Sequence, residues 1–292
     1  MSIPMNEDEI IVVDHVPQDV YLTFVQGAVR YAVLSLPFTV NRMDIREIER
    51  RVFNIAKGKL AERLFEWYCH QVGLEVDFRS CQTPFWAVDR RDFLFRGYEW
   101  DLKNNFLYYS GEKFNRYTQL PALVPNRHDH DQWSSRLETK FPHSRGVNFL
   151  FTFMKGADVL PNGQRRYFLE LHFSEEQLRF LQKLVDKYQG HPADHPPFDG
   201  EKCWQRWKRL NPTVIQLNFR PALVITGYAD REQWHLFRNV GPGDTDSDSS
   251  KWFVPVGARG SLSWLNGVLW TTIDNMVAPV DQLKSFHSLV SR

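Results

Sequence analysis

The chain has 292 residues, 42% of them hydrophobic and 24% charged, which is the composition of an ordinary soluble globular protein with a large core. Its net charge of +1 gives no global signature of nucleic-acid binding, and its three widely separated cysteines cannot supply the four thiolates of an iron–sulfur cluster or an all-cysteine zinc site. No run of about 18 apolar residues and no signal-peptide layout occurs, so we expect an intracellular, cytoplasmic protein outside the membrane.

The start of the chain reads as β structure. Apolar runs between residues 10 and 40 are separated by Pro17, Gly27 and Pro37, which are typical turn residues. Nothing in these runs carries chemistry. We therefore predict an N-terminal β segment that acts as a scaffold or faces a partner.

A helical pattern follows. Between Asp44 and Val72 apolar residues recur three and four positions apart, with Asp44 as the expected N-cap and Gly58 as a point where the helix can divide. Glu62 lies on a second line of small and apolar residues. A helix buried on two sides would bury this carboxylate, which would then need a partner. The alternative is an exposed Glu62, or one bonded to Lys59 or Arg63.

The most informative stretch, residues 91–105, predicts a β-hairpin with Arg96-Gly97 as its tip. Counting outward from the tip puts Asp92 directly opposite Asp101, with Cβ atoms roughly 4.5–5.5 Å apart. Lys103 lies on the same face, two residues further on. Opposed carboxylates destabilise a hairpin, and a divalent metal is the simplest way to offset their repulsion. The alternative is a solvated cross-strand ion pair.

The rest of the chain predicts a series of strands and helices. Further strands are expected at residues 74–78, 146–154, 166–173, 214–219 and 222–227. Ser174 and Gln177 have the spacing of a capping box, which predicts a helix from residue 174 onward. The proline-rich residues 191–200 are the best candidate for a linker. Beyond them, Trp204 and Trp207 either stack on bases or pack on one face of a helix.

The part of the chain with Glu62 and the predicted hairpin resembles the PD-(D/E)XK nuclease superfamily, the fold of many restriction, recombination and repair nucleases. The resemblance rests on the helix carrying Glu62, the carboxylate of Asp92 and the run Asp101-Leu102-Lys103. The resemblance covers roughly residues 45–110. Members have a helix with a glutamate, followed by a hairpin that bears an aspartate and an acid-x-lysine. The residue before Asp92 is Arg91, where the family motif has proline.

The resemblance implies a Mg²⁺-dependent phosphodiester hydrolase, with Mn²⁺ as a substitute, and the residue types suit that chemistry. The metal would lower the pKa of a bound water and offset charge on the phosphate, while Lys103 would orient that water. Glu99 is a reserve ligand on the same face. The expected metal ligands are Glu62, Asp92, Asp101 and the carbonyl of Leu102. The expected nucleic-acid contacts are Lys57, Lys59, Arg90 and Arg91.

Other polar clusters carry weaker signals. The run His128-Asp129-His130-Asp131 offers ligands for Zn, Ni or Mn, but alternating ligands in a loop seldom converge on one ion, and a solvated loop is the simpler interpretation. Asp244 to Asp248 begins like a Ca²⁺ loop, but Ser249 and Pro255 stand where glycine and glutamate are required. Glu138-Thr139-Lys140 is a second acid-x-lysine that lacks an alternating strand and a preceding helix.

We therefore predict an α/β protein with a mixed central β-sheet flanked by helices. A restriction-endonuclease-like core at about residues 44–173 would lie within residues 1–190, and residues 191–292 would form a C-terminal α+β extension for substrate binding or dimerisation. The expected function is DNA hydrolysis by an endonuclease of the restriction, repair or mobile-element type, compatible with a homodimer. The alternative is a non-catalytic nucleic-acid-binding or assembly protein of the same fold. The sequence leaves four properties open. These are the sequence specificity, the preference for DNA or RNA, the cleavage of single or double strands, and the choice between endo- and exonucleolytic attack.

Overall fold

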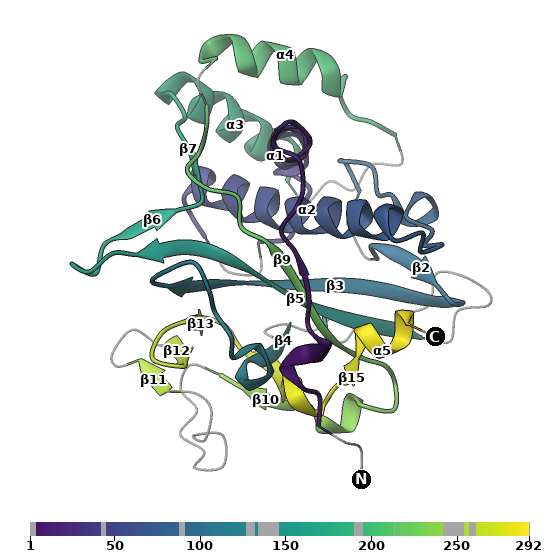
Figure 1. Cartoon of the computed structure of the whole chain (residues 1–292). Helices are drawn as coiled ribbons and strands as arrows, with labels where there is room; N and C mark the ends of the chain where they lie inside the picture. The colour runs from purple at the N-terminus through teal and green to yellow at the C-terminus, as the bar shows by residue number, and fades with distance from the viewer. Residues whose placement is uncertain are drawn as a thin grey trace.

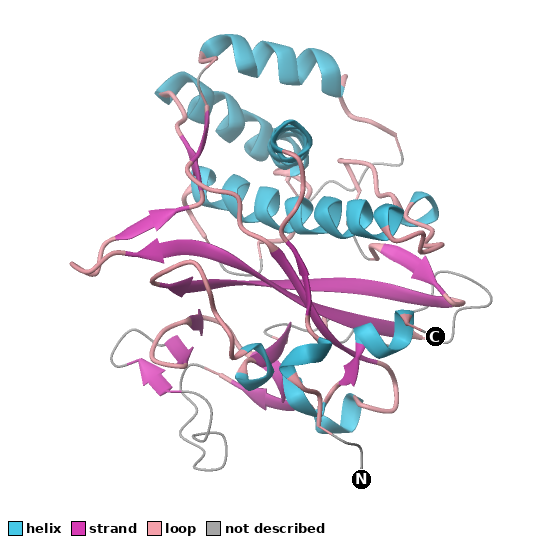
Figure 2. Ribbon diagram, viewed as in Figure 1, coloured by secondary structure: helices cyan, strands magenta, loops and turns pink. Residues whose placement is uncertain are grey.

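A seven-stranded mixed β-sheet runs through the middle of the molecule, with a layer of helices and a two-stranded sheet on one face and two three-stranded sheets on the other (Figures 1 and 2). This confirms the predicted mixed sheet flanked by helices. The structure, a computed structural model, describes residues 4–41, 45–87, 91–126, 132–133, 146–189, 195–212, 214–241, 254–256 and 261–291.

The main sheet has the central order β1-β9-β5-β3-β2, with β15 added to β9 and β6 added to β5. The long strands β3 and β5 are parallel, and the other pairs are antiparallel. No described strand pairs with the outer edge of β3 beyond Trp100. The strands are β1 (Ile11–Val13), β2 (Phe93–Phe95), β3 (Tyr98–Tyr109), β5 (Val147–Val159), β6 (Arg165–Tyr167), β9 (Leu223–Ala229) and β15 (Lys284–Ser285).

Smaller sheets complete the β structure. One has the order β10-β14-β4, a second has the order β11-β12-β13, and β7 pairs with β8. Their bounds are β4 (Pro121–Pro125), β7 (Leu169–Leu171), β8 (Ile215–Leu217), β10 (Arg238–Val240), β11 (Val254–Val256), β12 (Ser261–Trp264), β13 (Leu269–Thr271) and β14 (Asn275–Pro279).

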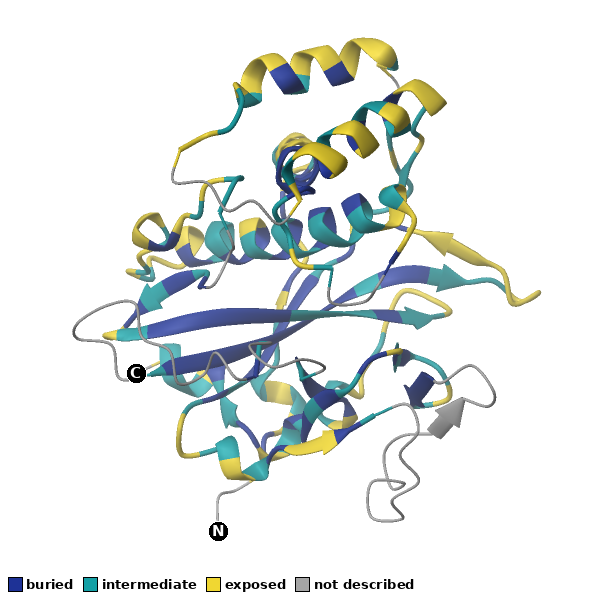
Figure 3. Cartoon of the chain, turned by 180° about the vertical axis from the view of Figure 1, so that it is seen from behind, coloured by how far each residue is buried: buried dark blue, intermediate teal, exposed yellow. Residues whose placement is uncertain are grey.

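The helical layer lies against one face of the main sheet, and α3 and α4 turn exposed surfaces away from it (Figures 1 and 3). The predicted capping box is confirmed, because Ser174 Oγ accepts from the Gln177 N–H and the Gln177 side chain accepts from the Ser174 N–H. None of the described helices has the length and apolar character that a membrane span requires. The helices are α1 (Gln18–Ser35), α2 (Ile48–Gln71), α3 (Glu175–Tyr188), α4 (Gly200–Leu210) and α5 (Phe286–Val290).

The predicted N-terminal β segment was wrong for most of its length. Only β1 is a strand, and α1 occupies the region in which two further strands were expected. The buried residues Tyr21, Val25 and Val29 recur every fourth position, which is the spacing of one helix face. Pro17 is the N-cap of α1, and its missing N–H costs the helix no hydrogen bond because the helix begins after it.

The helix carrying Glu62 and the segment after it also differ from expectation. Helix α2 is continuous through Gly58 and begins after Glu47, so Asp44, which lies outside the described residues, is not its N-cap. The strand expected at residues 74–78 is reduced to a single bridge between Asp77 and Leu94.

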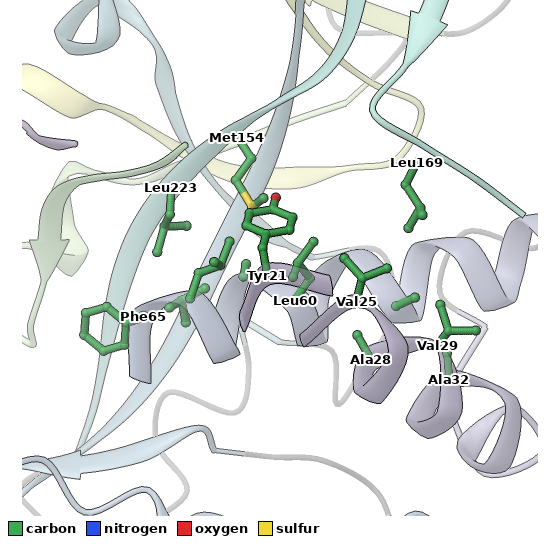
Figure 4. Packing of buried hydrophobic residues seen from close by; sticks show 14 of the residues in the cluster. Tyr21, Val25, Ala28, Val29, Ala32, Leu60, Phe65, Met154, Leu169 and Leu223 are labelled. Carbon is green, nitrogen blue, oxygen red and sulfur yellow. The ribbon is translucent and has the colours of Figure 1, made fainter. Parts of the chain in front are cut away.

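Apolar side chains form one cluster on each face of the main sheet. On β5, Phe149 and Phe151 enter the cluster beneath the sheet, whereas Leu150 and Met154 enter the cluster shared with α1 and α2. Figure 4 shows Met154 beside Tyr21 of α1 at this contact. The cluster that a side chain of β3 or β5 belongs to therefore shows on which face of the main sheet that side chain lies.

The part of the chain beyond residue 191, which was expected as an extension, contributes to the same core. Strand β9 lies between β1 and β5 in the main sheet. On α4, Trp207 is fully buried and its ring stacks 5.3 Å from that of Trp204, so the packing interpretation of this pair is confirmed for Trp207.

Candidate functional site

The predicted hairpin is present, with the predicted tip. Phe95 pairs with Tyr98 and Phe93 with Trp100, while Arg96 and Gly97 both have positive φ, as a two-residue hairpin turn requires. Strand β2 begins at Phe93, so Asp92 is the first residue beyond the ladder. Its position in the register is the one opposite Asp101.

Asp92 bonds to the main chain of the opposite arm. Its Oδ2 accepts a hydrogen bond from the Leu102 N–H at 2.6 Å, and its own N–H donates to the Trp100 carbonyl at 2.9 Å. In an extended strand the N–H and C=O of one residue point to the same side. The Leu102 carbonyl therefore faces the same edge as the Asp92 carboxylate.

Asp101 and Lys103 form an ion pair with 2.5 Å between Oδ2 and Nζ. Both residues are more than nine-tenths buried. The Lys103 ammonium lies 5.4 Å from the centre of the Phe149 ring. Phe149 belongs to the cluster beneath the sheet, so this pair lies on the face of β3 away from α2.

Arg91 and Glu99 form a second ion pair deeper in the hairpin. The distance from Nε to Oε2 is 2.6 Å, and the two side chains are 1% and 0% exposed. Arg91 was expected to contact nucleic acid, and the structure places it in this buried ion pair and in the wall of a cavity that Asp92 also lines. The same bond occupies Glu99, the reserve metal ligand.

Glu62 and Asp92 line one cavity of about 250 Å³ between α1, α2 and residues 78–83. Lys59 lines it too, and its Nζ lies 2.7 Å from Glu62 Oε2. The alternative in which Glu62 bonds to Lys59 is therefore confirmed, and Lys59 is not simply an exposed phosphate contact. This cavity does not include Asp101.

The structure thus divides the predicted site. Asp92 is the residue that both parts share, because it borders the cavity of Glu62 and contacts the main chain beside Asp101. Glu62 and Asp101 lie on opposite sides of β3, and among the residues that the structure describes no three acidic, histidine or cysteine side chains form a metal-holding group. Several candidates lie outside the described residues, namely Arg90, the run 128–131, the run 138–140 and the run 244–248.

The donor set at the hairpin is nevertheless one that Mg²⁺ accepts. Magnesium is usually bound by one or two carboxylates and keeps several of its own waters. Asp92 and Asp101 supply two carboxylates that flank Leu102 in the register, and the Leu102 carbonyl faces the same edge. A full protein cage is not required, so the hairpin residues fit this ion without Glu62.

A larger cleft of about 1070 Å³ adjoins the hairpin. Its walls come from the first half of α2, the middle of β3, the segment β6–β7 and β13. Arginine and lysine side chains meet aromatic rings in it. Its lining includes Arg50, Phe53, Lys57, Asn104, Phe106, Tyr108, Arg165 and Trp270.

Lys57 reaches into this cleft and is 9% exposed. Its Nζ lies 4.4 Å from the centre of the Phe53 ring and 4.5 Å from that of Phe106. Burial, and then the positive charge of Arg50, lower the pKa of Lys57 from 10.5 to about 7. Lys57 and Lys59, both expected to contact nucleic acid, line different cavities.

The sequence prediction missed the aromatic lining of the cleft. Phe53 and Lys57 are four residues apart on one helix, a spacing that places them on the same face and could have indicated the contact. Tyr108 and Trp270 come from distant parts of the chain, so no local pattern relates them to Arg165.

No protein-family model matches this chain, and neither does any curated protein or solved structure with which it was compared.

Proposed function

We propose that the protein is a metal-dependent nuclease with a restriction-endonuclease-like core, and that it hydrolyses phosphodiester bonds of DNA. The observation that carries this proposal is the contact of Asp92 with the Leu102 main chain, between Asp101 and Lys103. Two carboxylates, one carbonyl and one amine thereby lie on neighbouring positions of a single hairpin. Their order is the one that the PD-(D/E)XK resemblance requires.

Asp92, Asp101 and the Leu102 carbonyl would hold Mg²⁺. The ion, when bound, supplies an acidified water and a positive charge beside the phosphate. Lys103 would orient the attacking water and stabilise the negative charge that develops on the phosphate. The pair with Asp101 holds the ammonium next to the carboxylate that it would assist, 2.5 Å away. Glu62 adds a carboxylate to the cavity that Asp92 borders.

Buried charges support a functional interpretation of the hairpin. Two ion pairs, Arg91–Glu99 and Asp101–Lys103, occupy neighbouring positions of β3 against apolar surroundings. Ion pairs of this kind are expensive to desolvate and often contribute little net stability. Endonucleolytic cleavage of both DNA strands would need two such hairpins, so a homodimer is part of the proposal.

A second candidate is a non-catalytic nucleic-acid-binding or assembly protein. It is favoured by the division of the predicted site, because Asp101 and Lys103 neutralise each other on the face of β3 opposite Glu62. In that case the pair would only stabilise the hairpin. Nucleic-acid binding would then be insensitive to divalent metal, and no cleavage would occur.

Cleavage of supercoiled plasmid in Mg²⁺, Mn²⁺ or EDTA separates these candidates. The nuclease proposal predicts nicked or linear product with either metal and none in EDTA. Asp92→Asn should abolish cleavage while the far-UV circular dichroism spectrum stays unchanged. The matched control is Asp186→Asn on α3, an exposed aspartate that bonds only to Gln182 among the described contacts.

The outcome decides between the two functions. Full cleavage by Asp92→Asn would show that the hairpin carboxylate takes no part in the reaction. An intact plasmid with wild-type protein in both metals, together with retained DNA binding, would support the non-catalytic candidate.

A further inference from the structure

The cleft beside α2 gathers positive charge without acidic partners. Among the described contacts, no carboxylate pairs with Arg50, Lys57 or Arg165. The neighbouring Arg166, by contrast, contacts Asp158 at 3.4 Å. The charges of Arg165 and Arg50 both act on Tyr108, and the charge of Arg50 also acts on Lys57. An anion is the natural ligand for such a group.

Lys57 is the most constrained of these cations. Nine-tenths of it is buried, and its Nζ contacts only the Phe53 and Phe106 rings among the described residues. A buried ammonium is costly unless it is paired, and ring contacts offset only part of that cost. A phosphate in the cleft would provide the missing opposite charge.

Aromatic rings line the same space. The Arg165 guanidinium lies over Tyr108 at 4.9 Å and over Trp270 at 5.7 Å from their centres. Rings of this kind provide stacking surfaces for unpaired bases, which a duplex keeps inside its own stack. Phosphate-binding cations between stacking rings are the combination found in proteins that bind single strands.

One polar side chain of the cleft wall is held in place from within. Asn104 Oδ1 accepts a hydrogen bond from Thr152 Oγ1 at 3.0 Å. Its Nδ2 is buried and has no partner within the described structure. The cations and the rings are therefore the groups of the cleft that a ligand would contact.

Three acidic residues also line the cleft. Glu47 and Glu49 lie at the N-terminus of α2, and Glu170 on β7 is 3.8 Å from His172 and accepts from the Asn218 side chain. Among the described contacts, none of the three forms an ion pair with Arg50, Lys57 or Arg165. The positive charge of these three residues is therefore not neutralised by a described ion pair.

The cleft continues from the hairpin along one strand. Asn104 and Leu102 are two residues apart on β3, which corresponds to about 7 Å along the strand. The outer edge of β3 carries no paired strand over this part of the described chain. Among the residues that line the cleft, Asn104 is therefore the one nearest to the hairpin carboxylates along β3.

We propose that this cleft binds a single-stranded segment of nucleic acid, with phosphates at Arg50, Lys57 and Arg165 and unpaired bases against the surrounding rings. The choice of nucleic acid over another phosphorylated aromatic ligand rests on the proposed function. The binding itself does not require catalysis. The protein would hold an unpaired strand, or one locally opened from a duplex, beside the hairpin.

The test is fluorescence anisotropy in EDTA with a fluorescein-labelled dT12 oligonucleotide, a 12-base-pair duplex, and ATP as a competitor. We expect dT12 to bind more tightly than the duplex. Arg165→Gln should weaken dT12 binding by about tenfold, the usual effect of one charged hydrogen bond. It should also reduce the salt slope by about 0.7, the value for one phosphate contact on a single strand. Arg166→Gln is the matched control and should change neither quantity.

Lys57→Met provides a second variant that removes the buried charge without adding volume, and it should also weaken dT12 binding. Equal affinity for duplex and dT12, or unchanged binding in both Arg165→Gln and Lys57→Met, would overturn the proposal. Binding of ATP without binding of dT12 would assign the cleft to free nucleotides and would also overturn it. Tight dT12 binding with no plasmid cleavage in Mg²⁺ would support single-strand binding by the cleft and would contradict the nuclease proposal.

Discussion

The buried pair of Arg91 and Glu99 gives the most quantitative prediction about the hairpin. Both side chains are essentially inaccessible, and 2.6 Å separates Arg91 Nε from Glu99 Oε2. Arg91 directly precedes Asp92, so the pair also fixes the chain at the point where Asp92 meets Leu102. Replacing either partner alone removes an opposite charge from a site that water does not reach.

The expected cost follows from that burial. Arg91→Met or Glu99→Leu alone should lower the free energy of unfolding by about 3–5 kcal/mol, the range for breaking a buried ion pair. The double variant should unfold close to wild type, because apolar side chains of similar volume can replace a buried pair. An exposed pair would contribute at most about 1 kcal/mol.

Urea denaturation followed by tryptophan fluorescence measures these differences. The four proteins form a double-mutant cycle whose coupling energy reports the pair itself. Single variants that each lose less than about 1 kcal/mol, or a double variant whose loss is the sum of both, would refute the description of this pair as buried and mutually dependent.

Two further predictions concern stability. Lys57 has a pKa of about 7 in the folded chain and of 10.5 when it is exposed, so the unfolded chain binds more protons between these two pH values. The stability of the wild-type protein should therefore rise with pH in this range, whereas Lys57→Met should lack this rise. Melting temperatures of the two proteins that change in parallel from pH 7 to 10 would contradict this prediction. Gly97 has φ +77, a backbone conformation that alanine adopts at a cost, so Gly97→Ala should destabilise the protein by about 1 kcal/mol. Gly58 lies within helix α2 with open space around its Cα, so Gly58→Ala should stabilise the protein by about 0.5–1 kcal/mol. Urea denaturation measures both changes, and midpoints that shift in the same direction for the two variants would contradict this prediction.

The hairpin was predictable because its signals are local. Period-two alternation and a tip that needs positive φ set both its register and its turn, and the structure has Phe95 opposite Tyr98 as counted. The capping box at Ser174 was equally local. In both cases the deciding interactions join residues less than ten positions apart.

Helix α1 was missed because β-branched residues were given more weight than their spacing. Val20, Val25, Val29 and Val33 favour strands by type, but a strand preference mainly reflects packing on a half-buried surface. Here the apolar face that α2 and the sheet cover recurs every three to four residues. Tertiary packing decided the outcome.

The division of the site could not be predicted from the register. Counting residues placed Asp101 and Lys103 on one face of β3, and that face is confirmed by their neighbour Phe149. Which face α2 covers depends on Trp100 and Leu102 packing against the helical layer. No pattern within residues 45–110 contains that information. The cleft around Lys57 needed β6 and β13, which lie further along the chain.

The central claim is that the hairpin carboxylates hold a divalent metal, and Mn²⁺ binding followed by electron paramagnetic resonance tests it most directly. Titration of Mn²⁺ into the metal-free protein should show loss of the free-ion signal, and Mg²⁺ should restore that signal by competition. Asp92→Asn and Asp101→Asn should each abolish this binding, while Asp186→Asn should bind like wild type. Unchanged Mn²⁺ binding in Asp92→Asn and Asp101→Asn, or no binding by the folded wild-type protein, would contradict the claim.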